Sequence, residues 1–74
     1  EIVADARVSI DEINDLLDSE IDDAEVDTVG GFLLNRLGKI PSVGDQVRVD
    51  GLVISVLSTN GRRVKKVQIA RVAS

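Results

Sequence analysis

The residues of this 74-residue chain that could do chemistry are carboxylates and basic groups. The chain contains no histidine and no cysteine, which removes the usual general base and the imidazole and thiolate metal ligands. The acids are densest in the segment 18–27, where Asp22, Asp23 and Glu25 are the candidate ligands for a metal. Mg²⁺ and Ca²⁺ prefer oxygen ligands, so weak binding of either ion is one hypothesis. A solvated surface loop is the alternative, because the segment lacks the glycine and final glutamate of a calcium-binding EF-hand.

A basic cluster follows Asn60-Gly61 and consists of Arg62, Arg63, Lys65 and Lys66. Such a cluster can dock on an acidic protein surface, on anionic lipid headgroups or on a nucleotide. The alternative is an exposed hairpin whose charges only hinder pairing with other sheets. Because binding to a partner weakens as salt rises and a protective edge has no partner, ionic strength discriminates between the two.

The charges are divided along the chain. Residues 1–27 hold eleven acids against one arginine, and residues 28–74 hold eight basic residues against two acids. This asymmetry indicates either complementary surfaces that meet within a fold or between subunits, or an electrostatic address for a partner. We favour mutual neutralisation of the two halves.

Two adjacent glycines, Gly30 and Gly31, fall near the expected start of a helix, where free N–H groups attract anions. However, the sequence has neither of the glycine-rich phosphate-binding motifs, so close helix packing is the favoured explanation. Phe32 is the only aromatic residue, which leaves no platform for stacking bases and argues against a nucleic-acid partner. With no nucleophile paired to a base, we do not expect an enzyme.

Periodicity predicts a first strand over 2–8, with Ala4, Ala6 and Val8 on one face and Val3, Asp5 and Arg7 on the other. Ser9 and Glu12 have the spacing of a capping box, so a helix begins there. The buried stripe of this helix is expected to be Ile10, Ile13, Leu16 and Leu17, with Asn14 among the residues opposite.

A second helix is predicted over 28–37, capped by Asp27 and ended by Gly38. Its buried face is expected to be Val29, Phe32, Leu33 and Leu37, and three residues of the acidic segment, Ile21, Ala24 and Val26, are expected to touch the core.

Three strands are predicted over 46–50, 52–59 and 62–72. Asp50-Gly51 marks one tight turn, and Asn60-Gly61 has the composition of a type I′ hairpin turn. The spacing of valines predicts a bulge or twist near Lys65-Lys66. Together the elements indicate an α+β fold, a small two-layer sandwich in the order β-α-α-β-β-β with two helices on one face of an antiparallel sheet.

These motifs resemble a known family. The segment from Asp27-Thr28 to Gly31, the run Leu37-Gly38 to Gly44-Asp45, and the basic run after Gly61 are similar to the CorC/HlyC transporter-associated domain. The resemblance covers nearly the whole chain. The chain starts at Glu1 and contains no methionine, so we expect residues 1–74 to be one domain excised from a longer protein.

The resemblance implies a non-catalytic accessory or regulatory domain of a magnesium and cobalt efflux protein or hemolysin-like protein. It implies CBS domains and a transmembrane domain of the parent protein as partners, with a homodimer as a further option, on the cytoplasmic face of the bacterial inner membrane. It also implies a fold like that of FAD-binding domains. The alternative function is therefore a sensor that binds an adenine nucleotide or flavin, although fold alone does not establish function.

Overall fold

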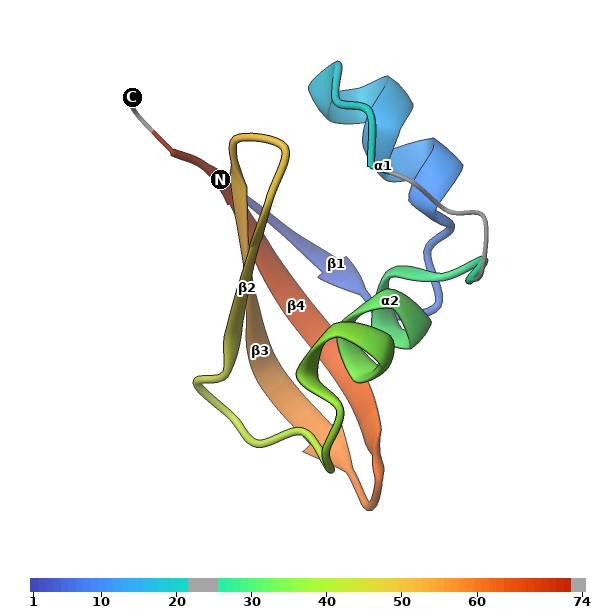
Figure 1. Ribbon diagram of the computed structural model, residues 1–74, viewed down its shortest axis with the longest axis vertical. Helices are drawn as coiled ribbons and strands as arrows, with labels where there is room; N and C mark the ends of the chain where they lie inside the picture. The colour runs from blue at the N-terminus through green and yellow to red at the C-terminus, as the bar shows by residue number, and fades with distance from the viewer. Residues whose placement is uncertain (22–25, 73–74) are drawn as a thin grey trace.

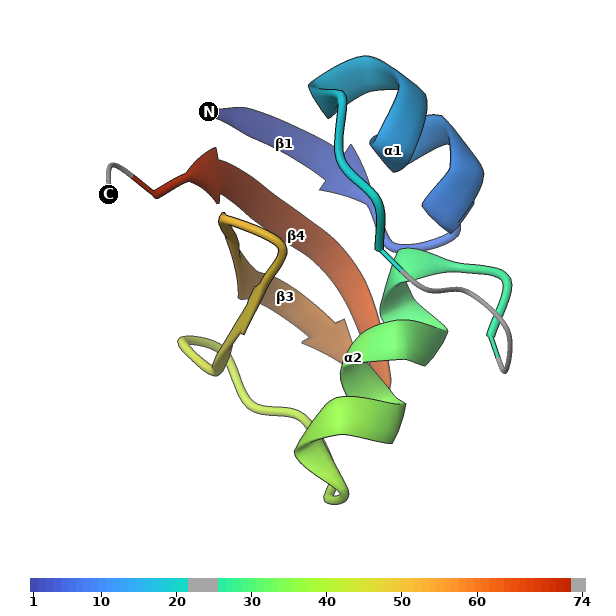
Figure 2. The ribbon, with the colours of Figure 1, turned by 45° about the horizontal axis from the view of Figure 1, so that its top comes forward.

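The computed structural model describes residues 1–21 and 26–72, which form a four-stranded antiparallel sheet with two helices on one face (Figures 1 and 2). The elements in chain order are β1 (Ile2–Asp5), α1 (Ile10–Leu17), α2 (Val29–Leu37), β2 (Gln46–Val49), β3 (Leu52–Asn60) and β4 (Arg63–Arg71). The strands lie in the order β1-β4-β3-β2. The predicted α+β sandwich and its element order are confirmed.

The core lies between the sheet and the helices. Alternate residues of β3 and β4 point into it because successive side chains of a strand face opposite sides of a sheet. The buried apolar residues are Ala6, Ile10, Ile13, Ile21, Val29, Phe32, Leu33, Leu52, Ile54, Val56, Val64, Val67 and Ile69. Among the residues predicted from the acidic segment, Ile21 is buried and Val26 is half-buried, whereas Ala24 lies outside the described residues.

Helix α1 begins as predicted, since the Ser9 hydroxyl accepts a hydrogen bond from the Glu12 N–H at 3.1 Å. Ile10 and Ile13 are fully buried, but Leu16 is 66% exposed, so its predicted place in the core is wrong. The reason is that α1 meets the core along a narrow stripe, which Leu17 continues one turn after Ile13 and which excludes Leu16.

The loop after α1 is organised by Asn14, which the sequence predicted on the solvent face. Its Oδ1 accepts hydrogen bonds from the Ser19 hydroxyl and the Ile21 N–H, both at 2.8 Å, and its Nδ2 donates to the Ile21 carbonyl at 3.0 Å. This half-buried amide therefore places Ile21 in the core.

The N-cap of α2 is Thr28, so the prediction of Asp27 was wrong by one residue. The Thr28 hydroxyl accepts from the Gly31 N–H at 3.1 Å, while the Asp27 carbonyl accepts from the Ile10 N–H at 2.9 Å. Asp27 thus joins the starts of the two helices through its backbone. Gly38 ends the helix in the left-handed conformation, with φ of 65°, as predicted.

Strand β1 ends at Asp5 and not at Val8. The Asp5 carboxylate accepts from the Arg7 N–H at 2.8 Å, and the Asp5 carbonyl accepts from the Val8 N–H at 3.0 Å. These bonds turn the chain, because a short acidic side chain competes with the sheet for backbone donors. Ala4, Ala6 and Val8, which were predicted to share one face, all contact the core.

The hairpin turns confirm one prediction and shift the other. Asp50 and Gly51 have φ of 50° and 75°, the pattern of a type I′ turn, so β2 ends at Val49. In the β3–β4 hairpin, Asn60 pairs with Arg63, which makes Gly61-Arg62 the turn. Only Gly61 has positive φ there, the pattern of type II′, so the turn predicted at Asn60-Gly61 is one residue early.

The register of β3 against β4 is irregular beyond Val56, which pairs with Val67. Leu57 and Lys65 are both left out of the pairing. The bulge predicted near Lys65 is confirmed, and Leu57 on the opposite strand is a second irregularity that the sequence did not indicate.

Candidate functional site

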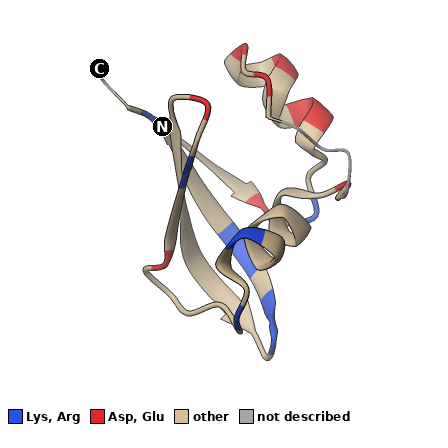
Figure 3. Cartoon of the chain, viewed as in Figure 1, with Lys and Arg blue, Asp and Glu red and all other residues tan. Residues whose placement is uncertain are grey.

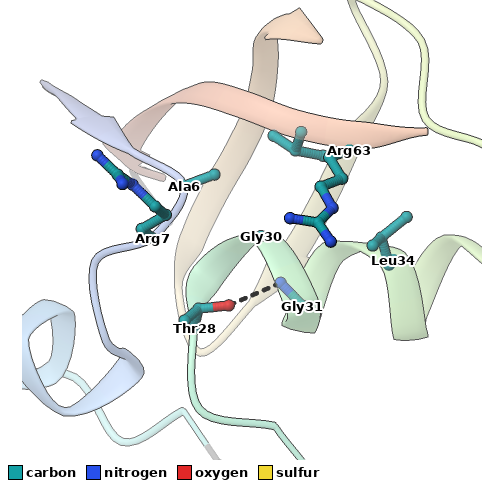
Figure 4. Close-up of a pocket in the computed structure, with 8 residues that line it drawn as sticks. Ala6, Arg7, Thr28, Gly30, Gly31, Leu34 and Arg63 are labelled. Atoms are coloured by element: carbon teal, nitrogen blue, oxygen red, sulfur yellow. Dashed lines mark hydrogen bonds between the residues drawn. The ribbon is translucent and has the colours of Figure 1, made fainter. Parts of the chain in front are cut away.

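Two adjoining hollows lie where the end of β1, the first turn of α2 and the β3–β4 hairpin meet, and Figure 4 shows the one beside α2. Their volumes are about 330 and about 310 Å³, and they share Arg7, Arg63 and Val64. We call the two together the basic groove, which is lined by Asp5, Ala6, Arg7, Thr28, Gly30, Gly31, Leu34, Asn60, Arg63, Val64 and Lys65.

The floor of the basic groove is apolar on the side of α2, where Ala6, Leu34 and Val64 line it together with Gly30. Gly30 is needed for this packing. A Cβ at Gly30 would lie 2.9 Å from the Ala6 Cβ and 3.0 Å from the Ala6 carbonyl oxygen. The favoured explanation of the glycine pair, close helix packing, therefore holds at Gly30, and its neighbour is the segment that follows β1.

The first three N–H groups of α2 all donate within the chain. The Val29 N–H donates to the Val8 carbonyl at 3.0 Å, the Gly30 N–H to the Ala6 carbonyl at 2.9 Å, and the Gly31 N–H to the Thr28 hydroxyl. A helix N-terminus binds phosphate through free donors of this kind. These three N–H groups are therefore not free to bind an anion, and polar recognition in the groove depends on side chains.

The cations at the rim differ in their pairing. Arg7 forms an ion pair with Asp5 at 3.3 Å, and its side chain is 91% exposed. The hydrogen bond from the Arg7 N–H, with a second from its guanidinium, lowers the pKa of the Asp5 carboxyl below its ordinary value of 3.8. Within the described part of the chain, the side chains of Arg63 and Lys65 have no hydrogen-bond or ion-pair partner. These two cations are available to a ligand.

The structure brings together only part of the predicted basic cluster. Arg63 and Lys65 line the groove, Arg62 lies in the hairpin turn, and Lys66 pairs across the sheet with Asp5. Sequence reasoning missed Arg7, which joins the rim from the other end of the chain. No local pattern signals this neighbour, because the proximity follows from the pairing of β1 with β4.

The predicted metal ligands Asp22, Asp23 and Glu25 lie outside the described residues. In the stretches 1–21 and 26–72, no three acids are grouped so that they could hold a metal ion. The metal hypothesis thus stays a prediction.

The acidic and basic halves of the sequence meet in the sheet, where β1 pairs with β4 and Asp5 lies opposite Lys66, but most of their charges lie apart. Figure 3 shows acids along α1 and basic residues on the β3–β4 hairpin and α2. The ion pairs of Arg7 with Asp5 and of Lys39 with Asp45 each join residues of the same half. The halves also touch at Arg71, whose guanidinium donates to the Leu17 carbonyl at the end of α1, and at Gln68, whose amide donates to the Glu1 carboxylate at 3.1 Å. Mutual neutralisation remains a prediction.

Comparison with known proteins identifies the family. Residues 1–73 match the sequence model of the CorC_HlyC transporter associated domain. The magnesium and cobalt efflux protein CorC of Salmonella typhimurium is 33% identical over 64 residues, which are 86% of this chain and 22% of that protein. The chain thus spans less than a quarter of the length of the curated relatives that it matches.

Solved structures agree with this match. The CorC-associated region of a putative Mg²⁺ and Co²⁺ transporter from Neisseria meningitidis is 31% identical, with a TM-score of 0.88 over 95% of this chain and 86% of that one. The domain of a Xylella fastidiosa hemolysin, solved in complex with Mg²⁺ and Mn²⁺, is 25% identical, with a TM-score of 0.87 over 96% of this chain and 86% of that one. Neither helix of the described residues is long and apolar enough to cross a membrane. The chain belongs to the CorC/HlyC family of transporter-associated domains.

Proposed function

We propose that this domain is a non-catalytic accessory domain of a magnesium and cobalt type cation transporter, and that it acts by docking its basic groove on an acidic surface of a neighbouring domain or subunit. CBS domains and the transmembrane domain of the parent protein, on the cytoplasmic face of the inner membrane, are the setting. The observation that carries the proposal is the pair of cations Arg63 and Lys65, which have no side-chain partner within residues 1–21 and 26–72 and lie beside an apolar floor.

The chemistry of the groove favours a carboxylate-bearing partner. The Arg63 guanidinium can bind a carboxylate with two parallel hydrogen bonds, a geometry that a lysine cannot provide. The Arg7 guanidinium already bonds Asp5 through Nε and would have to share its remaining donors. Burial of an aliphatic group of the partner against the apolar floor would add favourable free energy. A free phosphate group would use only the rim, because the N–H groups of Val29, Gly30 and Gly31 are already bonded.

The test is the double variant Arg63→Glu/Lys65→Glu in the transporter that carries this domain. Cation efflux by cells or proteoliposomes and the association of the subunits are measured together. Arg48→Glu is the matched control, because Arg48 is an exposed arginine of β2 outside the groove. We expect the double variant to alter efflux or assembly while its domain keeps the circular dichroism spectrum of the unaltered domain. The control Arg48→Glu should change neither efflux nor assembly. Unchanged efflux and assembly in the double variant would reject docking through the groove.

A second candidate function is divalent-cation binding at Asp22, Asp23 and Glu25. The complex of the Xylella fastidiosa hemolysin domain with Mg²⁺ and Mn²⁺ favours it. In an NMR titration, Mn²⁺ should broaden the amide signals of these residues before others, and excess Mg²⁺ should reverse the broadening by competition. Asp45, an acid outside this segment, serves as the internal control. Uniform broadening of acidic residues across the domain would contradict a dedicated site.

A further inference from the structure

The outward face of α1 carries an exposed aliphatic side chain and two carboxylates. Leu16 is 66% exposed, Asp15 precedes it, and Glu12 lies one turn earlier on the same face. The Glu12 and Asp15 carboxylates have no partner among the residues that the structure describes. We call these three residues the acidic ridge. A basic and apolar partner would complement the charge of the two carboxylates and cover the leucine beside them.

The basic groove has the complementary properties. Its floor is lined by Ala6, Leu34 and Val64, and its rim carries Arg7 and Arg63. An aliphatic side chain on the floor would therefore lie beside the Arg63 guanidinium, while the Arg7 guanidinium, paired with Asp5, lies beyond Ala6 (Figure 4). Charge and polarity are complementary, since the ridge offers one apolar and two acidic side chains and the groove offers an apolar floor and a basic rim.

The ridge of one molecule cannot reach its own groove. The chain leaves the groove at Arg7, and α1, which begins at Ile10, leads away from it (Figure 1). Leu16 lies six residues into this helix, about 9 Å along its axis from Ile10. Only a second molecule can bring a ridge to a groove.

We propose that the acidic partner of the basic groove is α1 of a second copy of this chain, with Leu16 seated on the apolar floor and Asp15 and Glu12 paired with Arg63 and Arg7. Every copy carries one ridge and one groove, so in a two-fold pair each ridge occupies the groove of the other molecule. The inference rests on the proposed docking function and names the partner in it.

Charge reversal gives a test with an internal rescue. In a pair of Asp15→Lys molecules, the introduced lysine would face Arg63, a like charge, at both ridge-groove contacts. In a pair of Arg63→Glu molecules, Asp15 would face the introduced glutamate. An equimolar mixture of the two variants forms mixed pairs with two ridge-groove contacts. At one contact the introduced lysine faces the introduced glutamate. At the other contact Asp15 faces Arg63, as in the unaltered pair. The measurement is sedimentation equilibrium of the 74-residue chain up to about 1 mM, at low ionic strength and again at about 0.5 M salt.

We expect the unaltered chain to self-associate, and we expect this association to weaken as the salt concentration rises. Each single reversal should weaken association by at least about tenfold, and the mixture should recover it. Leu16→Ser should weaken association without changing charge, whereas the controls Arg48→Glu and Val3→Ser, at exposed positions outside ridge and groove, should not. Circular dichroism verifies that every variant is folded.

Two results would overturn the inference: an unaltered chain that stays monomeric at the highest concentration, or a mixture that associates no better than either single variant. Neither result decides the proposed function. If Arg63→Glu/Lys65→Glu changes cation efflux while the isolated chain is monomeric, docking stands and the partner lies elsewhere in the transporter. If the chain associates as described and efflux and assembly are unaffected by the double variant, the proposed function is rejected instead.

Discussion

Gly30→Ala should destabilise the domain, although the same exchange normally stabilises a helix. Alanine is favoured over glycine inside helices by about 1 kcal/mol. At Gly30, however, the added Cβ would lie 2.9 Å from the Ala6 Cβ and 3.0 Å from the Ala6 carbonyl oxygen. Neither atom belongs to a flexible side chain that can swing aside, so the helix itself has to move.

The size of the effect follows from three contributions. Overpacking of a well-packed contact costs about 1–3 kcal/mol, and weakening the hydrogen bond from the Gly30 N–H to the Ala6 carbonyl costs about 1 kcal/mol. The gain in helix propensity offsets about 1 kcal/mol. The free energy of unfolding should therefore fall by about 2 kcal/mol, which lowers the Tm of a domain of this size by about 8–16 °C.

The assay is urea and thermal unfolding followed by far-ultraviolet circular dichroism, since the chain has no tryptophan or tyrosine to report by fluorescence. Gly31→Ala is the matched control one residue along the same helix. Its Cβ would approach only the Thr28 hydroxyl oxygen at 3.2 Å and Val26 side-chain atoms at 3.8 Å or more. Gly31→Ala should leave the stability nearly unchanged or raise it. A Gly30→Ala variant as stable as Gly31→Ala would refute the reasoning.

Three further predictions concern the caps, the loop and pH. Thr28→Ala should lower the free energy of unfolding by about 1 kcal/mol and Asp27→Ala by less, because Thr28 supplies the cap; urea titration ranks them. Asn14→Ala should cost about 1–3 kcal/mol in the same assay, since it leaves buried groups of the loop unsatisfied. The lowered pKa of Asp5 means that its contribution to stability is present above its ordinary value of 3.8 and is lost as pH falls through the folded value. In an NMR titration, Arg7→Ala should raise the pKa of Asp5 only part of the way, because the N–H of residue 7 still donates.

Much of the fold could be predicted from the sequence because its signals are local. The spacing of Ser9 and Glu12, the glycine at 38 and the pair Asp50-Gly51 each dictate backbone geometry within a few residues. Apolar periodicity then assigns most of the core, since a helix or strand has only one face to bury.

The errors arose where distant segments decide between local options. Asp27 and Thr28 can both cap a helix, and the choice falls on Thr28 because the Asp27 carbonyl is bonded to the N–H of Ile10. Leu16 has the spacing of a core residue but lies beyond the stripe that faces the sheet. The hairpin turn moved to Gly61-Arg62 together with the irregular pairing near Leu57, which no pattern within the turn reveals.

The candidate site was only half predictable for the same reason. The basic residues after Gly61 form a recognisable cluster in the sequence. Arg7, which lines the same rim, is more than fifty positions away from them. Its approach to Arg63 requires the pairing of β1 with β4 and the turn that Asp5 imposes.

The contact at Gly30 links the stability of the fold to the chemistry of the groove. The hydrogen bonds that hold α2 against the segment after β1 use the donors that would otherwise bind an anion. The structural contacts therefore lie in the backbone and the floor, and the charged groups available for recognition are exposed side chains of Arg7, Arg63 and Lys65. Among the described residues Arg63 and Lys65 have no side-chain partner, unlike Arg7, which pairs with Asp5, so replacing Arg63 or Lys65 costs little stability. It follows that the charge of the rim can change without loss of the fold, so charge reversal at Arg63 tests recognition and Gly30→Ala tests packing, each largely independently of the other.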